Sequence, residues 1–431
     1  MTDLTGTPQA GAAARLRAIL SERRGLVRDY LAAISGSAGR LVFSLIYFLA
    51  LANGLSLGDF GLFATASAAG IMLSRLLAFG FIAPLYRTAT VRPRLIGVYT
   101  GGFILLGVAS LPLIALAALA TWTLFFAATL PLGVFAAIVA SEVLLGRPGE
   151  AVTIVNNGMG RFGRGSFLTI FAVVCRTVAA VAFILTATSD LATWTWYYLA
   201  GNSLGLIVAA TFFYPRQRIR FVPKLYWRRL SDALSVAGSE VLFYLQSELD
   251  KFVVLAFGGA QLAGLYAIIM RLVELTAIPI RTFNMMLVQK MMRMPQLLAK
   301  LKTRVTIEVA IMAVSTAGIS CLALILHFYP TLLGRNISEA APLVMLVLLI
   351  PGFRNLVEYH AEILFARGQT FVRAINLAIL TAVKGGALAA VLMATTQPKP
   401  LIIALTGVFG LLYLTSAVLT YPALNRPVRR V

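Results

Sequence analysis

The chain has 431 residues, of which 59% are hydrophobic and 12% are charged, and its formal net charge at pH 7 is +21. Soluble domains are about half apolar and about a quarter charged, so a soluble fold is excluded for nearly the whole chain. Because a bilayer-spanning helix needs about 20 mostly apolar residues, about twelve such helices with short loops use up the length. No room is then expected for a catalytic domain outside the membrane.

The N-terminal segment 1–33 is predicted to be a basic cytoplasmic tail, since it lacks the apolar core and cleavage site of a signal peptide. After it, apolar runs predict twelve transmembrane spans. Their approximate bounds are 34–54, 58–82, 95–119, 122–145, 166–188, 191–213, 234–257, 262–288, 305–328, 340–364, 372–394 and 401–423.

The connections between the spans alternate in charge. Basic residues concentrate in the N-terminal tail, in the connections after every second span and at the C-terminus. The connection after the fourth span, for example, contributes Arg147, Arg161 and Arg164. The opposite connections carry only Arg335 and Lys399. By the positive-inside rule the basic side is cytoplasmic, which places both termini there. The positive charge therefore follows the membrane and gives no indication of a nucleic-acid partner.

A basic segment lies at the middle of the chain, and two similar turns lie on either side of it in the sequence. Asp59 to Ala64 (DFGLFA) resembles Leu262 to Ala267 (LAGLYA), and each opens a span predicted to run inward. Such an internal repeat favours two six-helix halves. The predicted organisation is a tail 1–33, an N-terminal six-helix bundle 34–213, a cytoplasmic linker 214–233, a C-terminal six-helix bundle 234–424 and a basic tail 425–431.

Two of these turns carry a family resemblance. The segment from Asn53 to Phe63 (NGLSLGDFGLF) resembles the first outer turn of bacterial polysaccharide transporters of the O-antigen flippase type. Asp250-Lys251-Phe252, followed by Gly258-Gly259 and Gly264-Leu265-Tyr266-Ala267, is similar to the signature of their second half. These proteins belong to the multidrug/oligosaccharidyl-lipid/polysaccharide (MOP) exporter superfamily.

The resemblance covers residues 31–424 and implies an all-α fold, with two six-helix bundles alternating access to a central cavity. It also implies that an undecaprenyl-diphosphate-linked oligosaccharide is moved across the bacterial inner membrane. A polysaccharide polymerase and export machinery are then expected partners.

Basic residues within the spans are candidates for binding such an anionic substrate. Arg40, Arg75 and Arg281 lie toward predicted cytoplasmic ends and Lys251 toward an outer end, where long side chains reach the interface. Arg176, Arg271, Arg354 and Lys384 lie near mid-span, where each costs about 3 kcal/mol to insert. These four are therefore expected to face a wet cavity or a carboxylate.

The four mid-span basic residues differ in whether an acidic residue lies within one helical turn. Glu274 follows Arg271 by three positions and Glu358 follows Arg354 by four, so either pair can be structural. Arg176 and Lys384 have no acidic residue within one helical turn, which makes them the stronger candidates for binding a diphosphate. Three carboxylates of the seventh span, Glu240, Glu248 and Asp250, are candidates for ion coupling, although simple charge pairing fits them as well.

The remaining motifs indicate no enzyme. Cys175 and Cys321 lie in separate apolar spans, and no P-loop, metal-ligand spacing or nucleophile elbow is found, so no catalytic residue, metal or cofactor is expected. Two alternatives stay open. A membrane polymerase or glycosyltransferase would need a larger outer loop than 329–339. A cation-coupled multidrug exporter would favour carboxylates over basic residues in its N-terminal spans.

Overall fold

The computed structural model describes residues 39–186, 190–277, 280, 284, 287 and 301–424. The two predicted tails lie outside the described residues, and so do Arg281 and most of the end of the eighth predicted span. Within this part of the chain every regular element is a helix. The predicted all-α fold is confirmed.

The N-terminal part begins with the apolar helix Gly39–Gly54. The elements that follow it are α2 (Leu57–Ser74), η1 (Leu77–Gly80), α3 (Ile82–Val91), η2 (Pro93–Leu95), α4 (Ile96–Phe125), α5 (Leu132–Ala140), η3 (Ser141–Gly146), α6 (Arg147–Gly158), α7 (Phe162–Leu185), α8 (Leu191–Val208) and η4 (Ala209–Phe213). The C-terminal part contains α9 (Pro223–Thr276), α11 (Leu301–Phe328), α12 (Arg335–Val344), η6 (Met345–Val347), α13 (Ile350–Ala366), α14 (Thr370–Ala394) and α15 (Pro398–Leu424).

Nine helices among the described residues are long and apolar enough to cross a membrane. The number is ten if the pair Arg335–Val347 and Ile350–Ala366, bent by 68°, is one span. The long helix α9 contains two predicted spans. A kink at Gly259, whose backbone angles are not helical (φ 76°, ψ 178°), separates them. The Tyr266 hydroxyl contacts the Asp250 carboxylate across this break, whereas a straight helix would hold the two about 24 Å apart. With Gly39–Gly54, the described helices overlap all twelve predicted spans.

One predicted boundary is wrong. The third and fourth spans were expected to turn near residue 120, but α4 continues to Phe125 and α5 begins at Leu132. The Trp122 indole N–H donates to the Leu130 carbonyl at 2.8 Å and fastens this turn. An unbroken apolar run surrounds it, so hydropathy alone does not locate the turn.

The fourth span is also longer than expected. Helix α5 continues through the π-helix η3 into α6, which ends at Gly158. Arg147, predicted to lie in a cytoplasmic connection, is therefore on a helix and is buried, with a side chain only 1% exposed.

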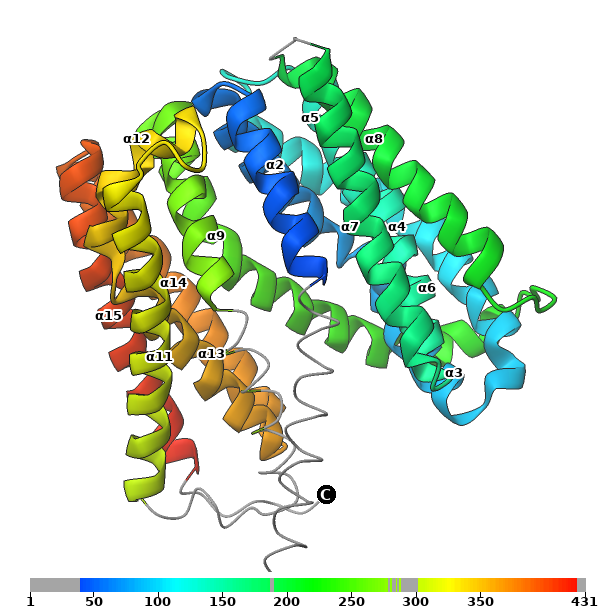
Figure 1. Cartoon of the computed structure of the whole chain (residues 1–431). Coiled ribbons are helices and arrows are strands. Elements are labelled where there is room, and N and C mark those ends of the chain that lie inside the picture. The colour runs from blue at the N-terminus through cyan, green and yellow to red at the C-terminus, as the bar shows by residue number, and fades with distance from the viewer. Residues whose placement is uncertain are drawn as a thin grey trace, which may run out of the picture.

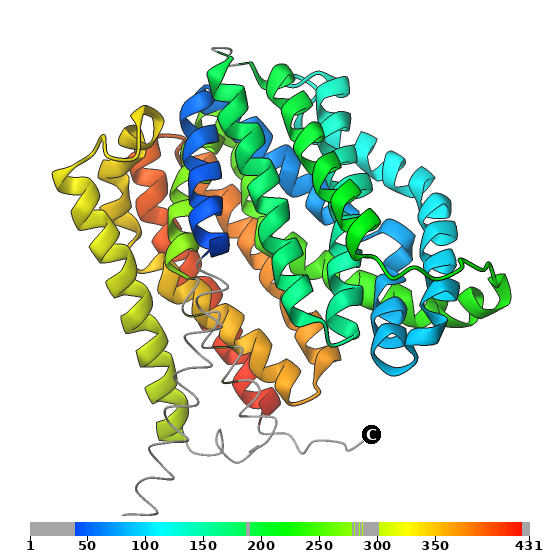
Figure 2. The ribbon, with the colours of Figure 1, turned by 45° about the vertical axis from the view of Figure 1, so that its right-hand side comes forward.

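The helices form two groups that meet at one end (Figure 1). Helices α2 to α8 lie on one side and α11 to α15 on the other. The start of α9 crosses from the first group to the second at the opposite end, and the turned view agrees (Figure 2). The Arg87 guanidinium and the Asp232 carboxylate, 2.5 Å apart, join α3 to the start of α9.

Close backbone approach holds the groups together where they meet. A Cβ on Gly61 of α2 would lie 2.4 Å from the Gly264 backbone nitrogen of α9, so only glycine fits there. The Asn336 amide donates to the carbonyls of Ala52 at 2.7 Å and Leu55 at 2.8 Å. These contacts join turns that the sequence places on the outer side.

Candidate functional site

A cavity of about 550 Å³ lies among α2, η3, α6, α7, α8 and α9. A second cavity of about 250 Å³ lies nearer the end where the two helix groups meet. Both cavities are lined by Ile71, Glu142, Arg176 and Arg271. They therefore form one polar region between the helix groups, which we call the central cavity.

Arg176, a predicted site residue, lies in the central cavity. Its Nε donates to Asn202 Oδ1 at 2.8 Å, and its guanidinium lies over the Tyr198 ring at 5.8 Å. The nearest carboxylate is Glu142, whose Oε2 is 4.0 Å from an Arg176 terminal nitrogen. The side chain is 28% exposed, so Arg176 is positioned on one edge and open to the cavity on the other.

Glu142 is a carboxylate of the central cavity that was not among the predicted site residues. It lies in the π-helix η3, where one turn is widened by an extra residue, and such turns are frequent at functional sites. The hydroxyls of Ser67 (2.9 Å) and Tyr198 donate to its Oε1. Glu142 is thus held by neutral donors beside Arg176. The π-helix has no sequence signal, although Glu142 itself stands out as an in-span acid.

Arg271 and Arg354, two further predicted residues, share one carboxylate. Glu274 accepts from Arg271 at 3.1 Å through one oxygen and from Arg354 at 2.7 Å through the other. Arg271 also donates to the Ser44 hydroxyl at 2.5 Å, across to the first helix group. With a 36% exposed side chain, Arg271 faces the central cavity, whereas Arg354 lies behind Glu274.

A network of two buried arginines and two partly exposed glutamates closes the cavity toward α9. The Arg147 guanidinium contacts Glu240 at 2.6 Å and Glu150 at 2.9 Å, and Arg75 contacts Glu150 at 2.9 Å. Arg75 was expected to extend to the membrane interface. It is instead buried, with its guanidinium 4.3 Å above the Tyr244 ring. The expectation fails because Glu150 lies on a helical extension of the fourth span, close enough to pair with Arg75.

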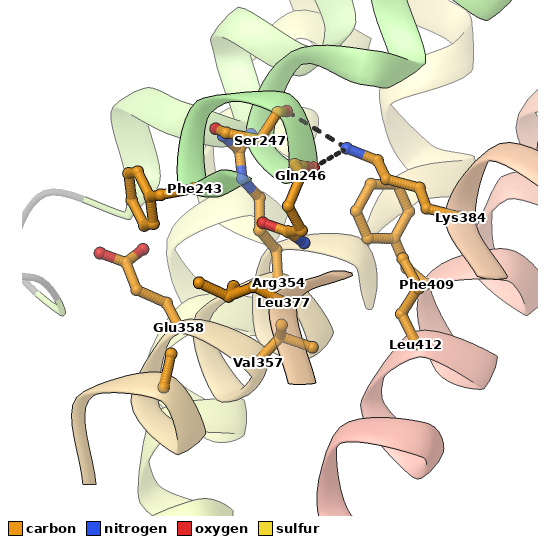
Figure 3. Close-up of a pocket in the computed structure, with 11 residues that line it drawn as sticks. Phe243, Gln246, Ser247, Arg354, Val357, Glu358, Leu377, Lys384, Phe409 and Leu412 are labelled. Carbon is orange, nitrogen blue, oxygen red and sulfur yellow. Dashed lines mark hydrogen bonds between the residues drawn. The ribbon is translucent and has the colours of Figure 1, made fainter. Parts of the chain in front are cut away.

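Lys384 has a different environment from Arg176. Its Nζ lies 3.0 Å from Asp250 Oδ1 and donates to the backbone carbonyls of Gln246 (3.0 Å) and Ser247 (3.2 Å). Figure 3 shows the ammonium directed at these two carbonyls on α9. The side chain is 4% exposed and borders a cavity of only about 50 Å³, away from Arg176. The sequence indicated no carboxylate on the same helix, but the fold supplies one from another helix.

The three candidate ion-coupling carboxylates are all paired with bases. Glu240 contacts Arg147, Asp250 contacts Lys384, and Glu248 lies 2.5 Å from Lys251. Of these, Glu248 lines the central cavity. The described residues contain no group of three or more His, Cys, Asp or Glu arranged to hold a metal ion.

Comparisons with known proteins agree with this architecture. No protein-family model matches the sequence, and no curated protein matches it. Among solved structures, the chain is similar to an inward-facing multidrug resistance MATE family transporter of the MOP superfamily (14% identity, 89% of this chain and 94% of that chain, TM-score 0.64). It is also similar to the lipid II flippase MurJ in an inward closed conformation (13% identity, 89% and 87%, TM-score 0.60).

A third similar structure is a MOP superfamily transporter from Pyrococcus furiosus, described as having a binding pocket of reverse polarity that suggests a different function (11% identity, 93% and 96%, TM-score 0.55). At these identities the likeness establishes the fold alone. The chain has the all-helical, multi-pass membrane fold of MOP superfamily transporters.

Proposed function

We propose that this transporter is a flippase of the O-antigen type. It moves an undecaprenyl-diphosphate-linked oligosaccharide from the inner to the outer leaflet of the bacterial inner membrane by alternating access. The observation that carries the proposal is the excess of basic groups in the central cavity. Its basic lining residues are Arg40, Arg75, Arg147, Arg176, Lys251 and Arg271, against the acidic Glu142, Glu150, Glu248 and Glu274.

The ion pairs in the cavity indicate which arginines are available to bind the substrate. Arg75 and Arg147 are neutralised by Glu150 and Glu240. Arg176 lies 4.0 Å from its nearest carboxylate, and Arg271 shares Glu274 with Arg354. In a partly dry cavity, two guanidinium groups bind a diphosphate through charge-assisted, bidentate hydrogen bonds. We therefore assign the diphosphate to Arg176 and Arg271, with Arg354 behind them and Lys384 in a structural role.

The similarity to a lipid II flippase supports a lipid-linked substrate. Both termini and the linker 214–233 are placed in the cytoplasm, and the halves 34–213 and 234–424 are the two moving bundles. Because the groups meet at the predicted outer end, the described state is open toward the cytoplasm (Figure 1). A polymerase and export machinery then act on the flipped product.

Deletion of the gene tests this function. The deletion strain should lose a surface or secreted polysaccharide while its lipid-linked precursor accumulates in the inner leaflet, and the plasmid-borne gene should restore both. Normal polymer in the deletion strain, or a defect limited to sensitivity to cationic drugs, would show that the assignment is wrong.

A cation-coupled drug exporter is the second candidate, favoured by the similarity to MATE family transporters. An exporter of cationic drugs needs carboxylates facing its cavity without cationic partners. Glu150 and Glu248 instead pair with Arg75 and Lys251, and Glu142 lies 4.0 Å from Arg176, which disfavours this candidate. An enzymatic role is disfavoured by the short connection between Phe328 and Arg335, which offers no domain for catalytic groups.

A further inference from the structure

A histidine and a glutamate form a buried pair in the second helix group, outside the central cavity. His360 of α13 is fully buried, and its Nε2 lies 2.9 Å from Glu308 Oε1 of α11. Its Nδ1 lies 3.0 Å from the Ser416 hydroxyl of α15. The pair therefore joins three membrane helices. No sequence pattern predicts it, because the two residues come from different spans.

Aromatic side chains enclose the pair. The Tyr413 and Tyr421 hydroxyls both donate to Glu308, the first at 2.8 Å. The Tyr413 ring stacks on the His360 ring with centroids 5.9 Å apart, and the Tyr421 ring meets it edge-on at 5.5 Å. The Tyr359 ring lies 5.9 Å away on the same helix as His360. The face of the stacked Tyr413 ring stabilises a cation, so the enclosure accepts an imidazolium as well as an imidazole.

Other charged groups lie around the pair. Arg304 lies one turn before Glu308 on α11, with its guanidinium 5.5 Å from the Tyr421 ring centroid. On α13, Glu358 lines the small cavity of Lys384, and Glu362 pairs with Arg373 of α14 at 3.1 Å. The Glu308 side chain is 11% exposed, so the carboxylate side of the pair is less enclosed than the fully buried His360 ring.

The hydrogen bonds of the pair accommodate two protonation states. In the neutral state, His360 Nε2–H donates to Glu308 and the Ser416 hydroxyl donates to Nδ1. When a proton is added to Nδ1, the Ser416 hydroxyl rotates and accepts from it, while Glu308 keeps its carboxylate. One proton taken from water is stored as an imidazolium, and its release restores the starting state.

This pairing differs from that of the carboxylates of the seventh span. Glu248 and Asp250 face Lys251 and Lys384, so protonating either of them removes the paired carboxylate of a lysine. Protonating Glu240 leaves Arg147 with Glu150 alone. Histidine is the side chain suited to exchanging a proton near neutral pH, and the Glu308 carboxylate at 2.9 Å is placed to balance an imidazolium.

We propose that His360 and Glu308 form the proton-binding site that couples transport to proton movement. This deepens the function proposed above by naming its coupling ion, a proton. The pair occupies the seam of α11, α13 and α15, so its protonation alters how these helices pack and shifts the balance between inward-open and outward-open states.

The chain contains only two histidines, His327 and His360, which makes direct titration feasible. The whole protein, labelled with ¹⁵N-histidine and carrying His327→Asn, is followed by NMR in micelles. The His360 ring should change from imidazole to imidazolium between about pH 8 and 5. In Glu308→Gln, which lacks the counter-ion, it should remain neutral over that range. A His360 ring that holds one state throughout in the parent protein overturns the proposal.

The second readout is the distance between the two helix groups, which can be measured without substrate. Spin labels at Val91 and Phe371, exposed residues of α3 and α14, report the separation of the two groups once Cys175 and Cys321 are replaced by serine. The distance distribution should shift between pH 8 and 5 in the parent and not in His360→Gln. The matched control His327→Gln, at an exposed position, should keep the shift.

If His360→Gln does not fold, Ser416→Ala replaces it in the test. This variant keeps the contact between His360 and Glu308 and removes only the hydroxyl that His360 Nδ1 contacts. An undiminished pH response in both His360→Gln and Ser416→Ala overturns the proposal. Neither readout involves a glycan, so a transporter with another substrate passes both tests. If the proton-site proposal is wrong, the result expected from the gene deletion does not change.

Discussion

Arg176 Nε donates to Asn202 Oδ1 at 2.8 Å, so one edge of the guanidinium is held by α8 while its terminal nitrogens serve other partners. Arg176→Ala should lose about 1.5–3 kcal/mol of binding to a charged group, roughly ten- to a hundredfold, while inserting normally. Arg176→Lys should retain part of the function, because it keeps the charge without the bidentate geometry. Glycan export in the deletion strain, normalised to protein level, measures this effect.

The matched control for Arg176 is Arg164, an exposed arginine of the same helix. Arg164→Ala should export normally, and Asn202→Ala should fall between the control and Arg176→Ala. Wild-type export by Arg176→Ala at a wild-type protein level would mean that the cavity arginines serve only to neutralise carboxylates.

Lys384 is expected to stabilise the fold rather than bind substrate. Lys384→Ala leaves Asp250 buried without its cation, which should cost about 3–5 kcal/mol. The double variant Lys384→Met, Asp250→Asn should recover much of that loss, since it removes both charges. Thermal unfolding of the purified protein measures both. If Lys384→Ala is as stable as the parent yet inactive in export, Lys384 belongs to the substrate site after all.

Arg147 should behave as a buried structural residue although the sequence places it among topology-setting charges. Arg147→Ala removes a buried guanidinium and both of its ion pairs, and because Glu240 and Glu150 are 33% and 40% exposed it should destabilise the protein by about 1–3 kcal/mol. Arg161, predicted to lie in the same connection, is exposed, so Arg161→Ala should leave stability within about 0.5 kcal/mol of the parent. Equal melting temperatures for the two variants would contradict the network around Arg147.

Gly61 should be required for the two groups to meet at the end predicted to face outward. A Cβ there would lie 2.5 Å from the Ala260 carbonyl oxygen, whereas one on Gly58 would come no closer than 3.6 Å to any atom outside its own helix. Gly61→Val should therefore disfavour the inward-open state and abolish export, while Gly58→Ala exports normally. Labelling of Ser67→Cys, a cavity residue, by an impermeant maleimide added outside should increase in Gly61→Val alone. Unchanged labelling and export would mean that the contact is dispensable.

The topology is tested by fusion. A reporter active only in the periplasm should stay silent when joined after Leu230 or at the C-terminus, because basic connections remain in the cytoplasm. The same reporter joined after Lys399, in a connection predicted to be outside, should be active. Strong activity after Leu230 would refute the predicted orientation.

The sequence by itself determined the membrane class and nearly all the helices of this protein. Span-length apolar runs have no stable alternative to a helix in a bilayer, because every backbone N–H and C=O must be paired within the chain. The glycine-containing turns at 53–63 and 258–267 could likewise be recognised from the sequence, since close backbone approach admits only glycine at Gly61 and Gly264. The turn near Pro131 was not, because hydropathy does not change across it.

Only the tertiary structure decided what each buried charge does. Arg176 and Lys384 look alike in sequence, each a basic residue at mid-span without a local acid. The fold gives Lys384 a carboxylate at 3.0 Å and leaves Arg176 at 4.0 Å from one, facing a cavity. His360 and Glu308 meet only because α11 and α13 pack together. Pairing between helices depends on which faces meet in space. Neighbours within one helix are fixed by spacing, but partners on other helices are fixed by packing.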